Sequence, residues 1–311
     1  MSQAALHPAA PRAKADEPRS GPRAWLSALR VHQWSKNGLI LVPLALAQAF
    51  ANPAQLAESL LAFVAFCLVS SATYLVNDLF DLAADRAHAT KRRRPIAAGE
   101  IAPGLAAGVA TGLLVIGLVG ASLLSRAFFG VMVIYVALTL LYSLRLKREP
   151  LIDVLTIGGL FTLRIVAGMV VIGQPVSLWL SSFTLVLFTS LATAKRHAEL
   201  VRAASNGGAV EGRAYLPADV PLTAAFGMAS AMTAVVVMLL YMALEAAGTG
   251  LYRQLSPLFL IPLVLAAWLA RIWIRAHRGA LQDDPVIFAL KDKASWLHAA
   301  AVAGLWVIAV R

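Results

Sequence analysis

The chain has 311 residues, of which 59% are hydrophobic and only 14% are charged, and its formal net charge is +11 at pH 7. An ordinary soluble domain is about one quarter charged, so this composition excludes a disordered protein and argues against a soluble globular enzyme. A chain that is both strongly apolar and strongly basic indicates a membrane protein whose loops are cationic or whose ligands are anionic. It argues against nucleic-acid binding, because too little polar sequence remains to build a basic surface. The single cysteine, Cys67, excludes a disulfide framework and a cysteine-based metal site.

Residues 1–24 are rich in Ala, Pro, Arg and Ser and contain no apolar stretch. A secretory signal would place an apolar core there, so we expect no signal peptide. The composition instead predicts a disordered cytoplasmic tail. Residues 25–311 are expected to form one transmembrane domain.

Nine apolar segments follow the tail. A helix that crosses a bilayer needs about 20 apolar residues, and most of the segments approach that length, although the first is the shortest. Spanning strands would show alternating apolar residues, and this alternation is absent. We therefore predict an all-α, polytopic membrane helical bundle with about nine transmembrane helices, near residues 38–50, 60–76, 105–124, 128–144, 151–172, 178–194, 220–244, 258–273 and 294–310.

Basic residues are distributed very unevenly between the loops. Most of the 27 Lys and Arg residues fall before the first segment or in the stretches after the second, fourth, sixth and eighth segments. Loops that face the cytoplasm carry an excess of Lys and Arg. This pattern predicts a cytoplasmic N-terminus and, for an odd number of spans, a C-terminus on the opposite side.

Three aspartates and an asparagine follow the second segment: Asn77, Asp78, Asp81 and Asp85. If the helix continues, Asn77, Asp81 and Asp85 share one face and Asp78 lies beside them. Magnesium prefers such hard oxygen ligands and is usually completed by waters and substrate phosphates. We predict a Mg²⁺ site here; the alternative is a solvated helix end whose acids pair with nearby basic residues.

The run Lys91-Arg92-Arg93-Arg94 comes six residues after the acidic cluster. Four adjacent cations can anchor a loop to anionic lipid. Next to an acidic cluster they can instead bind phosphate oxygens that the metal does not reach. Both interpretations stay open for different members of the run.

These motifs occur together in an order that resembles the UbiA-type polyprenyltransferase superfamily. The acidic cluster with the basic run and the following Pro95-Ile-Ala-Ala-Gly99 resembles its first aspartate-rich motif. Two more elements match, Arg30-Val-His-Gln-Trp34-Ser-Lys36-Asn37 before the first segment and Tyr142-Ser-Leu-Arg145-Leu-Lys147-Arg148 after the fourth. The resemblance covers nearly the whole chain and implies about nine helices whose cytoplasmic loops carry the chemistry.

One position departs from the superfamily's aromatic prenyltransferases. They carry a second DxxxD motif after the sixth span that helps to bind a prenyl diphosphate through magnesium, whereas this chain has Lys195 and Arg196 there. With Asp153 and Arg164 in the fifth segment, this form resembles the decaprenyl-phosphate phosphoribosyltransferase branch. The resemblance implies transfer of 5-phosphoribose from phosphoribosyl pyrophosphate to a polyprenyl phosphate at the bacterial inner membrane. That product leads to lipid-linked arabinose, for envelope arabinan or nodulation-factor arabinosylation.

Such a reaction brings two phosphorylated substrates together. The acceptor phosphate has a second pKa of about 6 and is largely dianionic at pH 7, so no strong general base is required. A magnesium ion would neutralise the leaving diphosphate, and nearby carboxylates would stabilise the ribosyl centre as it becomes positive. Arg164, whose burial in a bilayer costs roughly 2.5–3.5 kcal/mol, either contacts a phosphate or pairs with Asp153 or another polar neighbour.

The predicted site therefore has metal ligands, catalytic residues and substrate-binding residues. Asn77, Asp78, Asp81 and Asp85 are the expected metal ligands, and the three aspartates are also the expected catalytic residues. Expected partners are phosphoribosyl pyrophosphate, polyprenyl phosphate and membrane lipids, without nucleic acid. Two alternatives remain: an aromatic polyprenyltransferase with a prenyl diphosphate donor, and a transporter, which the clustering of acids at one interface disfavours. The expected substrate-binding residues are Lys36, Lys91, Arg92, Arg94, Tyr142, Lys147, Arg148, Asp153, Arg164, Lys195 and Arg196.

Overall fold

The computed structural model describes residues 21–205, 214–281 and 285–310, and all regular secondary structure in this part of the chain is helical. Eight of its helical stretches are long and apolar enough to cross a membrane. The prediction of an all-α, multi-pass membrane protein is confirmed. The long helices are α3 (Pro53–Phe80), α5 (Pro103–Leu124), α6 (Arg126–Leu144), α7 (Ile152–Val171), α8 (Leu178–Ser205), α9 (Val220–Leu244), α10 (Ile261–His277) and α12 (Lys293–Val310).

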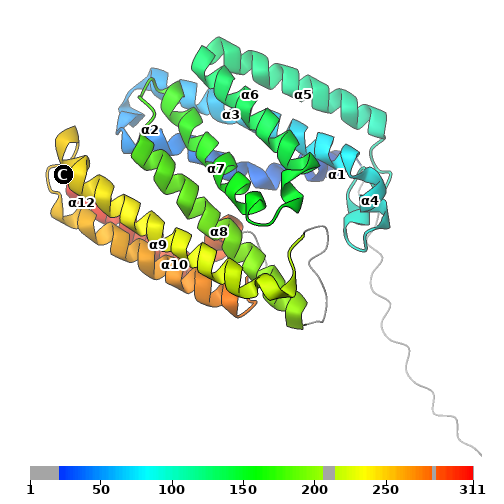
Figure 1. Cartoon of the computed structure of the whole chain (residues 1–311). Helices are drawn as coiled ribbons and strands as arrows, with labels where there is room; N and C mark the ends of the chain where they lie inside the picture. The colour runs from blue at the N-terminus through cyan, green and yellow to red at the C-terminus, as the bar shows by residue number, and fades with distance from the viewer. Residues whose placement is uncertain (1–20, 206–213, 282–284, 311) are drawn as a thin grey trace, which may run out of the picture.

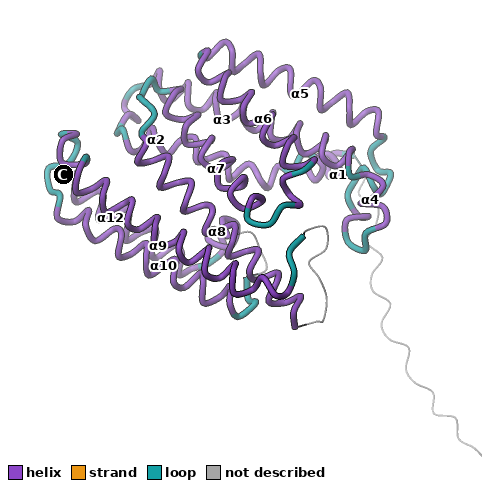
Figure 2. Tube along the Cα trace, viewed as in Figure 1, coloured by secondary structure: helices purple, strands orange, loops and turns teal. Residues whose placement is uncertain are grey.

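Short helices and 3-10 turns connect these spans. The short α-helices are α1 (Pro22–Ala28), α2 (Val42–Leu46), α4 (Leu82–Ala87) and α11 (Pro285–Lys291). The 3-10 segments are Val31–Leu41, Ala49–Ala51, Lys91–Arg93, Leu146–Arg148, Pro217–Asp219, Ala246–Thr249 and Ser256–Leu260. Figure 2 shows that the loops and short turns gather at the two ends of the bundle.

The long helices form two packed groups with a shared centre. In Figure 1, α3, α5 and α6 lie on one side, α9, α10 and α12 lie on the other, and α7 and α8 lie between them. One buried cluster joins α3, α6 and α7, and a second joins α8, α9 and α10. Phe161 of α7 stacks on Phe188 of α8 with 4.2 Å between ring centroids. These two rings connect the groups at the middle of the bundle.

Local sequence explains where the spans begin. The side chain of Asn52 accepts hydrogen bonds from the N–H groups of Ala54 and Gln55, and Pro53 occupies the first turn of α3. Ser125 accepts from the N–H of Phe128 and so separates α5 from α6. An N-cap side chain satisfies N–H groups that the helix leaves unpaired, and proline lacks the N–H that the first turn cannot use.

The first apolar segment differs from the expected α-helix. It consists of the 3-10 segment Val31–Leu41, which has 11 residues, and α2, which has 5. Because a 3-10 helix rises about 2.0 Å per residue, the two together extend about 30 Å, the thickness of a bilayer core. Arg30, at one end, contacts Asp78 near the end of α3. Gln48, at the other end, donates to the carbonyl of Leu251, between α9 and α10. The segment therefore crosses the bundle, although it is too irregular to count among the long helices.

This crossing lies very close to α7 because Gly168 has no side chain. A Cβ atom at Gly168 would lie 2.1 Å from the carbonyl oxygen of Ile40 and 2.9 Å from Pro43. Backbone atoms cannot move away as a flexible side chain can. The contact therefore needs glycine at this position.

Replacing Gly168 with alanine is expected to destabilise the bundle by about 1–3 kcal/mol, the usual cost of overpacking a core. Gly159→Ala is the matched control on the same helix, because its Cβ would meet only Leu138 at 3.9 Å. Thermal unfolding of the two purified variants measures the difference. An equal melting temperature for both variants would show that the close contact between the crossing segment and Gly168 of α7 does not contribute to stability.

The antiparallel order of the helices brings the basic loops to one end. The C-terminal ends of α3, α6, α8 and α10 share this end with residues 21–30, and we call it the charged end. Residues 1–20, most of the expected tail, lie outside the described residues. Helix α1 begins at Pro22 and buries Ala24, so residues 22–24, which we assigned to the tail, are helical.

Candidate active site

The chain turns at the point where the four predicted metal ligands lie. Helix α3 ends at Phe80 and α4 begins at Leu82, with Asp81 between them at φ −88° and ψ 4°. The Asp81 N–H still donates to the carbonyl of Asn77, and the Asp85 N–H to the carbonyl of Asp81. The change of direction at Asp81 nevertheless separates the acidic side chains. They form two groups instead of the single stripe that a continuing helix predicts.

The first group is a buried pair of carboxylates joined by arginine. Asp78 is 3% exposed and Asp85 is 2% exposed. Nη1 of Arg94 lies 3.0 Å from Asp78 and 2.7 Å from Asp85, and Nη2 of Arg30 lies 2.7 Å from the same oxygen of Asp78. We call the two aspartates, together with the two arginines that contact them, the arginine-bridged pair. Protein cations already balance both carboxylates. Pairing of these acids with nearby basic residues was also part of the alternative interpretation, a solvated helix end, although here the pair is buried.

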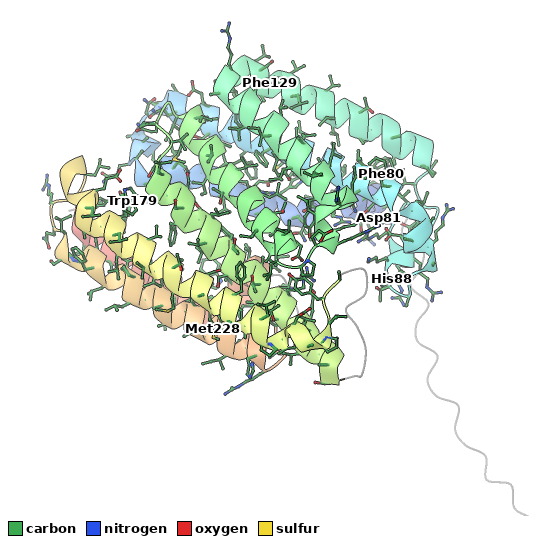
Figure 3. All side chains as sticks on the ribbon, in the orientation of Figure 1. Phe80, Asp81, His88, Phe129, Trp179 and Met228 are labelled. Carbon is green, nitrogen blue, oxygen red and sulfur yellow. The ribbon has the colours of Figure 1, made fainter. Side chains whose placement is uncertain are left out.

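The second group is open to solvent. Asp81 has a side chain that is 33% exposed, and the Nζ atom of Lys147 lies 3.2 and 3.0 Å from its two oxygens. The amide nitrogen of Asn77 donates to Asp81 at 3.3 Å. Figure 3 places Asp81 beside Phe80 at the charged end, far from Trp179 at the other end. This group brings together predicted residues from two motifs that are 66 positions apart.

The donor set determines how a metal ion would be held. No group of three His, Cys, Asp or Glu side chains within the described ranges is arranged to hold one without other ligands. Magnesium in transferase sites commonly takes one or two carboxylates and completes its shell with water and substrate phosphates. The amide oxygen of Asn77 and the carboxylate of Asp81 fit that role. In the structure, Asp78 and Asp85 bond arginines, and their expected role as metal ligands stays a prediction.

Asp153 and Arg196 form a buried ion pair. Asp153 is 0% exposed, and Nε of Arg196 lies 3.2 Å from one of its oxygens. Arg196 also bonds Glu199 one turn later on α8. The expectation was that Arg196 binds a substrate phosphate. In the structure its guanidinium is instead directed to carboxylates of α7 and α8.

Tyr215 completes this buried pair and was missed by the sequence reasoning. Its hydroxyl donates to Asp153 at 2.6 Å and accepts from the N–H of Leu151 at 2.8 Å. Burial, followed by the effect of the Asp153 carboxylate, raises the pKa of the Tyr215 hydroxyl, so the proton that it donates is retained. The bond to Leu151 stabilises a backbone with φ +64°, which is unfavourable for leucine. The only signal in the sequence was one aromatic residue in a polar connecting segment.

Arg164 is buried and bonded to neutral groups. Its Nε donates to Asn37 at 2.9 Å, and its other nitrogens donate to the carbonyl of Leu160 and the hydroxyl of Tyr135. The rings of Phe66, Tyr135 and Phe161 surround the guanidinium at 5.2–5.4 Å. The pairing with Asp153 that we considered is therefore wrong, since Asp153 pairs with Arg196. The polar-neighbour interpretation of Arg164 agrees with these contacts.

Of the remaining predicted residues, Lys36 lies within the first crossing, and the others lie at or near the charged end. Nζ of Lys36 is 5.9 Å from the ring centroid of Phe161. Lys195, inside α8, and Tyr142, near the end of α6, are half-buried, whereas Lys91, Arg92 and Arg148 are exposed. Among the predicted substrate-binding cations, Lys147 and Arg94 touch the acidic motif.

A cavity of about 330 Å³ opens beside the arginine-bridged pair. Arg92 is not among the residues that line it, although its neighbours on both sides are. Two of the lining cations, Arg30 and Arg93, were absent from the predicted site, even though both belong to motifs that the sequence shows. The cavity is lined by Ser27, Arg30, His32, Asp78, Thr90, Lys91, Arg93, Arg94 and Pro95.

Three relatives show what the chain is similar to. It is 50% identical over 287 residues to an uncharacterized protein, y4nM, of Sinorhizobium fredii, which covers 92% of this chain and 56% of that protein. The chain thus spans little more than half the length of this relative. It is 32% identical to the nodulation protein NoeC of Azorhizobium caulinodans, over 87% of this chain and 88% of NoeC. It is 35% identical to the decaprenyl-phosphate phosphoribosyltransferase of Corynebacterium glutamicum, over 96% of this chain and 88% of that enzyme.

A solved structure and a family pattern agree on the fold. A UbiA homolog from Archaeoglobus fulgidus, bound to DMAPP and Mg²⁺, superimposes with a TM-score of 0.69 over 93% of this chain and 100% of the other, at 18% identity. The pattern of the UbiA prenyltransferase family matches residues 39–307. The predicted superfamily is confirmed, and the similarity to decaprenyl-phosphate phosphoribosyltransferases agrees with the predicted branch. The chain therefore belongs to the UbiA prenyltransferase family, whose members are multi-pass membrane transferases.

Proposed function

We propose that this protein transfers 5-phosphoribose from phosphoribosyl pyrophosphate to a polyprenyl phosphate of the decaprenyl type. The observation that carries the proposal concerns Arg196. This residue occupies a position at which the family's aromatic prenyltransferases carry a second acidic motif. Arg196 is paired inward with Asp153. The group of Asn77 and Asp81 is therefore the candidate metal site, and the cation Lys147 contacts it. Such a site suits two phosphorylated substrates better than one prenyl diphosphate held between two acidic motifs.

The proposed reaction requires little acid–base chemistry from the protein. An oxygen of the acceptor phosphate forms a bond to C1 of the ribose, while the bond from C1 to the diphosphate breaks and the diphosphate leaves with the electron pair. Magnesium, when bound, would neutralise charge on that diphosphate. Asn77 and Asp81 would hold it, and Lys147, 3.0 Å from Asp81, would orient Asp81 and add a positive charge. The acceptor is already largely dianionic at pH 7, so no side chain has to remove a proton.

The relatives support the same substrates. The Corynebacterium glutamicum protein and its Mycobacterium tuberculosis counterpart, which is 36% identical over 92% of this chain, are both named decaprenyl-phosphate phosphoribosyltransferases. The similarity to NoeC, a nodulation protein, supports a product used for nodulation-factor arabinosylation. Envelope arabinan is the other destination that the same lipid-linked sugar would serve. Both destinations are part of the proposal.

We further propose that the charged end faces the cytoplasm of the bacterial inner membrane. Cationic loops are retained on the cytoplasmic side of bacterial membranes, and a phosphoribosyl donor is found there. With the irregular first crossing and eight long helices, the N-terminus would be cytoplasmic and the C-terminus external. A polar site at this end would accept a water-soluble donor while the lipid acceptor stays in the membrane.

The test uses the purified full chain in detergent with two donor and acceptor pairs. Labelled phosphoribosyl pyrophosphate and decaprenyl phosphate are expected to give a labelled lipid with Mg²⁺ and none with excess EDTA. The second pair, a prenyl diphosphate and an aromatic acid, is expected to give no product. Transfer with the second pair but not the first would contradict the proposal and favour an aromatic prenyltransferase.

A further inference from the structure

The cavity at the charged end is strongly cationic. Among the described residues, its wall carries the side chains of Arg30, Lys91, Arg93 and Arg94 and one carboxylate, that of Asp78. Three of these cations come from the stretch around the 3-10 segment Lys91–Arg93, Arg30 comes from the stretch between α1 and the first crossing, and Asp78 belongs to α3. Tertiary structure therefore adds Arg30 to the three cations that the basic run supplies.

Two of the cations are held in place by the arginine-bridged pair. Arg30 and Arg94 each use one terminal nitrogen to contact the buried carboxylates of Asp78 and Asp85. A guanidinium has five N–H donors in a rigid planar group. These anchored arginines therefore retain donors in a fixed orientation beside the cavity that both of them line. Such preorganised arginines suit the planar, bidentate recognition of phosphate oxygens.

The charges also match one class of ligand. Four cationic side chains line the cavity beside one described carboxylate, that of Asp78, which Arg30 and Arg94 contact. A phosphate monoester carries about −1.5 to −2 at pH 7. The carboxylates at this place are already neutralised by arginine. A bound monoester would thus meet N–H donors directly and would need no metal ion between it and the protein.

We propose that this cavity is a binding site for a phosphate monoester that is held without metal, distinct from the subsite of Asn77, Asp81 and Lys147. Asp78 and Asp85 act in it as positioning residues for Arg30 and Arg94. Under the proposed function two groups have this chemistry, the headgroup of the acceptor lipid and the 5-phosphate of the donor. The role of the site in turnover rests on the proposed function, whereas binding of the monoester does not.

The experiment measures binding to the full chain in detergent with excess EDTA, by titration calorimetry. The probes are geranyl phosphate and ribose 5-phosphate, and geraniol serves as the tail without a phosphate. The test variant is Lys91→Ala combined with Arg93→Ala, since both side chains are exposed and neither takes part in the bridged pair. Hydrogen bonds to charged groups contribute about 1.5–3 kcal/mol each, so we expect at least about tenfold weaker binding of the monoester that occupies the cavity.

Two further variants separate this site from its surroundings. Arg86→Ala removes an exposed cation from α4 that does not line the cavity, and we expect it to change the affinity less than about twofold. Asp81→Asn removes the candidate metal ligand and is expected to leave metal-free binding equally unchanged. Gel filtration of each variant confirms that it is folded.

The pattern of losses identifies the source of the phosphate. A weaker affinity for geranyl phosphate would assign the cavity to the acceptor headgroup, and a weaker affinity for ribose 5-phosphate would assign it to the donor. Either result supports the proposal. It is overturned if neither monoester binds in EDTA, if binding needs Mg²⁺, or if the double variant binds as tightly as the unchanged chain. If the unchanged chain binds a monoester in EDTA but transfers no phosphoribose, the proposed function is rejected and the monoester site is not.

Discussion

Asp81→Asn is expected to lower kcat/KM by about 10²–10³-fold, the usual cost of losing one preorganised group that stabilises charge in the transition state. The substitution keeps the size of the side chain and an oxygen to accept the hydrogen bond from Asn77. It removes the negative charge that Lys147 contacts and that a magnesium ion would need. Because the side chain is one-third exposed, the free energy of unfolding should change little.

The measurement is product formation at a series of Mg²⁺ concentrations, together with the melting temperature of the variant. Glu149→Gln is the control, since it removes an exposed carboxylate from the loop that carries Lys147. We expect this control to keep its activity. Unchanged product formation by Asp81→Asn would exclude Asp81 from the reaction and would leave the solvated helix end as the better interpretation of this acid.

Arg196→Met is expected to destabilise the protein by about 3–5 kcal/mol, because it removes the cation that lies 3.2 Å from the buried carboxylate of Asp153. Asp153 is 0% exposed, and Tyr215 offers it only a neutral donor. Combining Asp153→Asn with Arg196→Met removes both charges and should recover much of the lost stability. A recovery of this kind is the expected result for residues in direct contact.

Thermal unfolding of both single variants and of the double variant completes the cycle, and kinetics separate the two roles of Arg196. If Arg196 bound a substrate phosphate, Arg196→Met would raise KM for one substrate and leave the melting temperature unchanged. The double variant would then fail to recover anything. Such an outcome would restore the role that the sequence alone suggested for this arginine.

The transmembrane plan depends on local properties, and these are visible in the sequence. A run of about 20 apolar residues must satisfy its backbone hydrogen bonds within itself when lipid surrounds it, so it forms a helix wherever it occurs. The start of α3 at Pro53 and that of α6 at Arg126 follow from capping by Asn52 and Ser125. The uneven distribution of Lys and Arg identified in advance the end of the bundle that carries the polar side chains.

The first crossing could not be derived in the same way. Its 3-10 backbone depends on contacts with α3 and α7, where Asn37 bonds Ser70 and Arg164 and where Ile40 lies against Gly168. None of these neighbours is close in sequence. A periodic pattern can indicate a helix, but it does not show whether tight contacts with distant helices will give the segment a 3-10 backbone.

The residues of the candidate site were visible in the sequence, and their partners were not. The sequence alone determined the membrane-spanning helices, the charged end and the acidic and basic motifs, because hydropathy, charge and spacing are properties of short stretches. The tertiary structure decided that Asp81 faces Lys147, that Asp78 and Asp85 hold Arg94, and that Asp153 receives Arg196 and Tyr215. A buried charge must be neutralised by whichever opposite charge the packing of distant helices brings near it, and that choice is made only when the bundle closes.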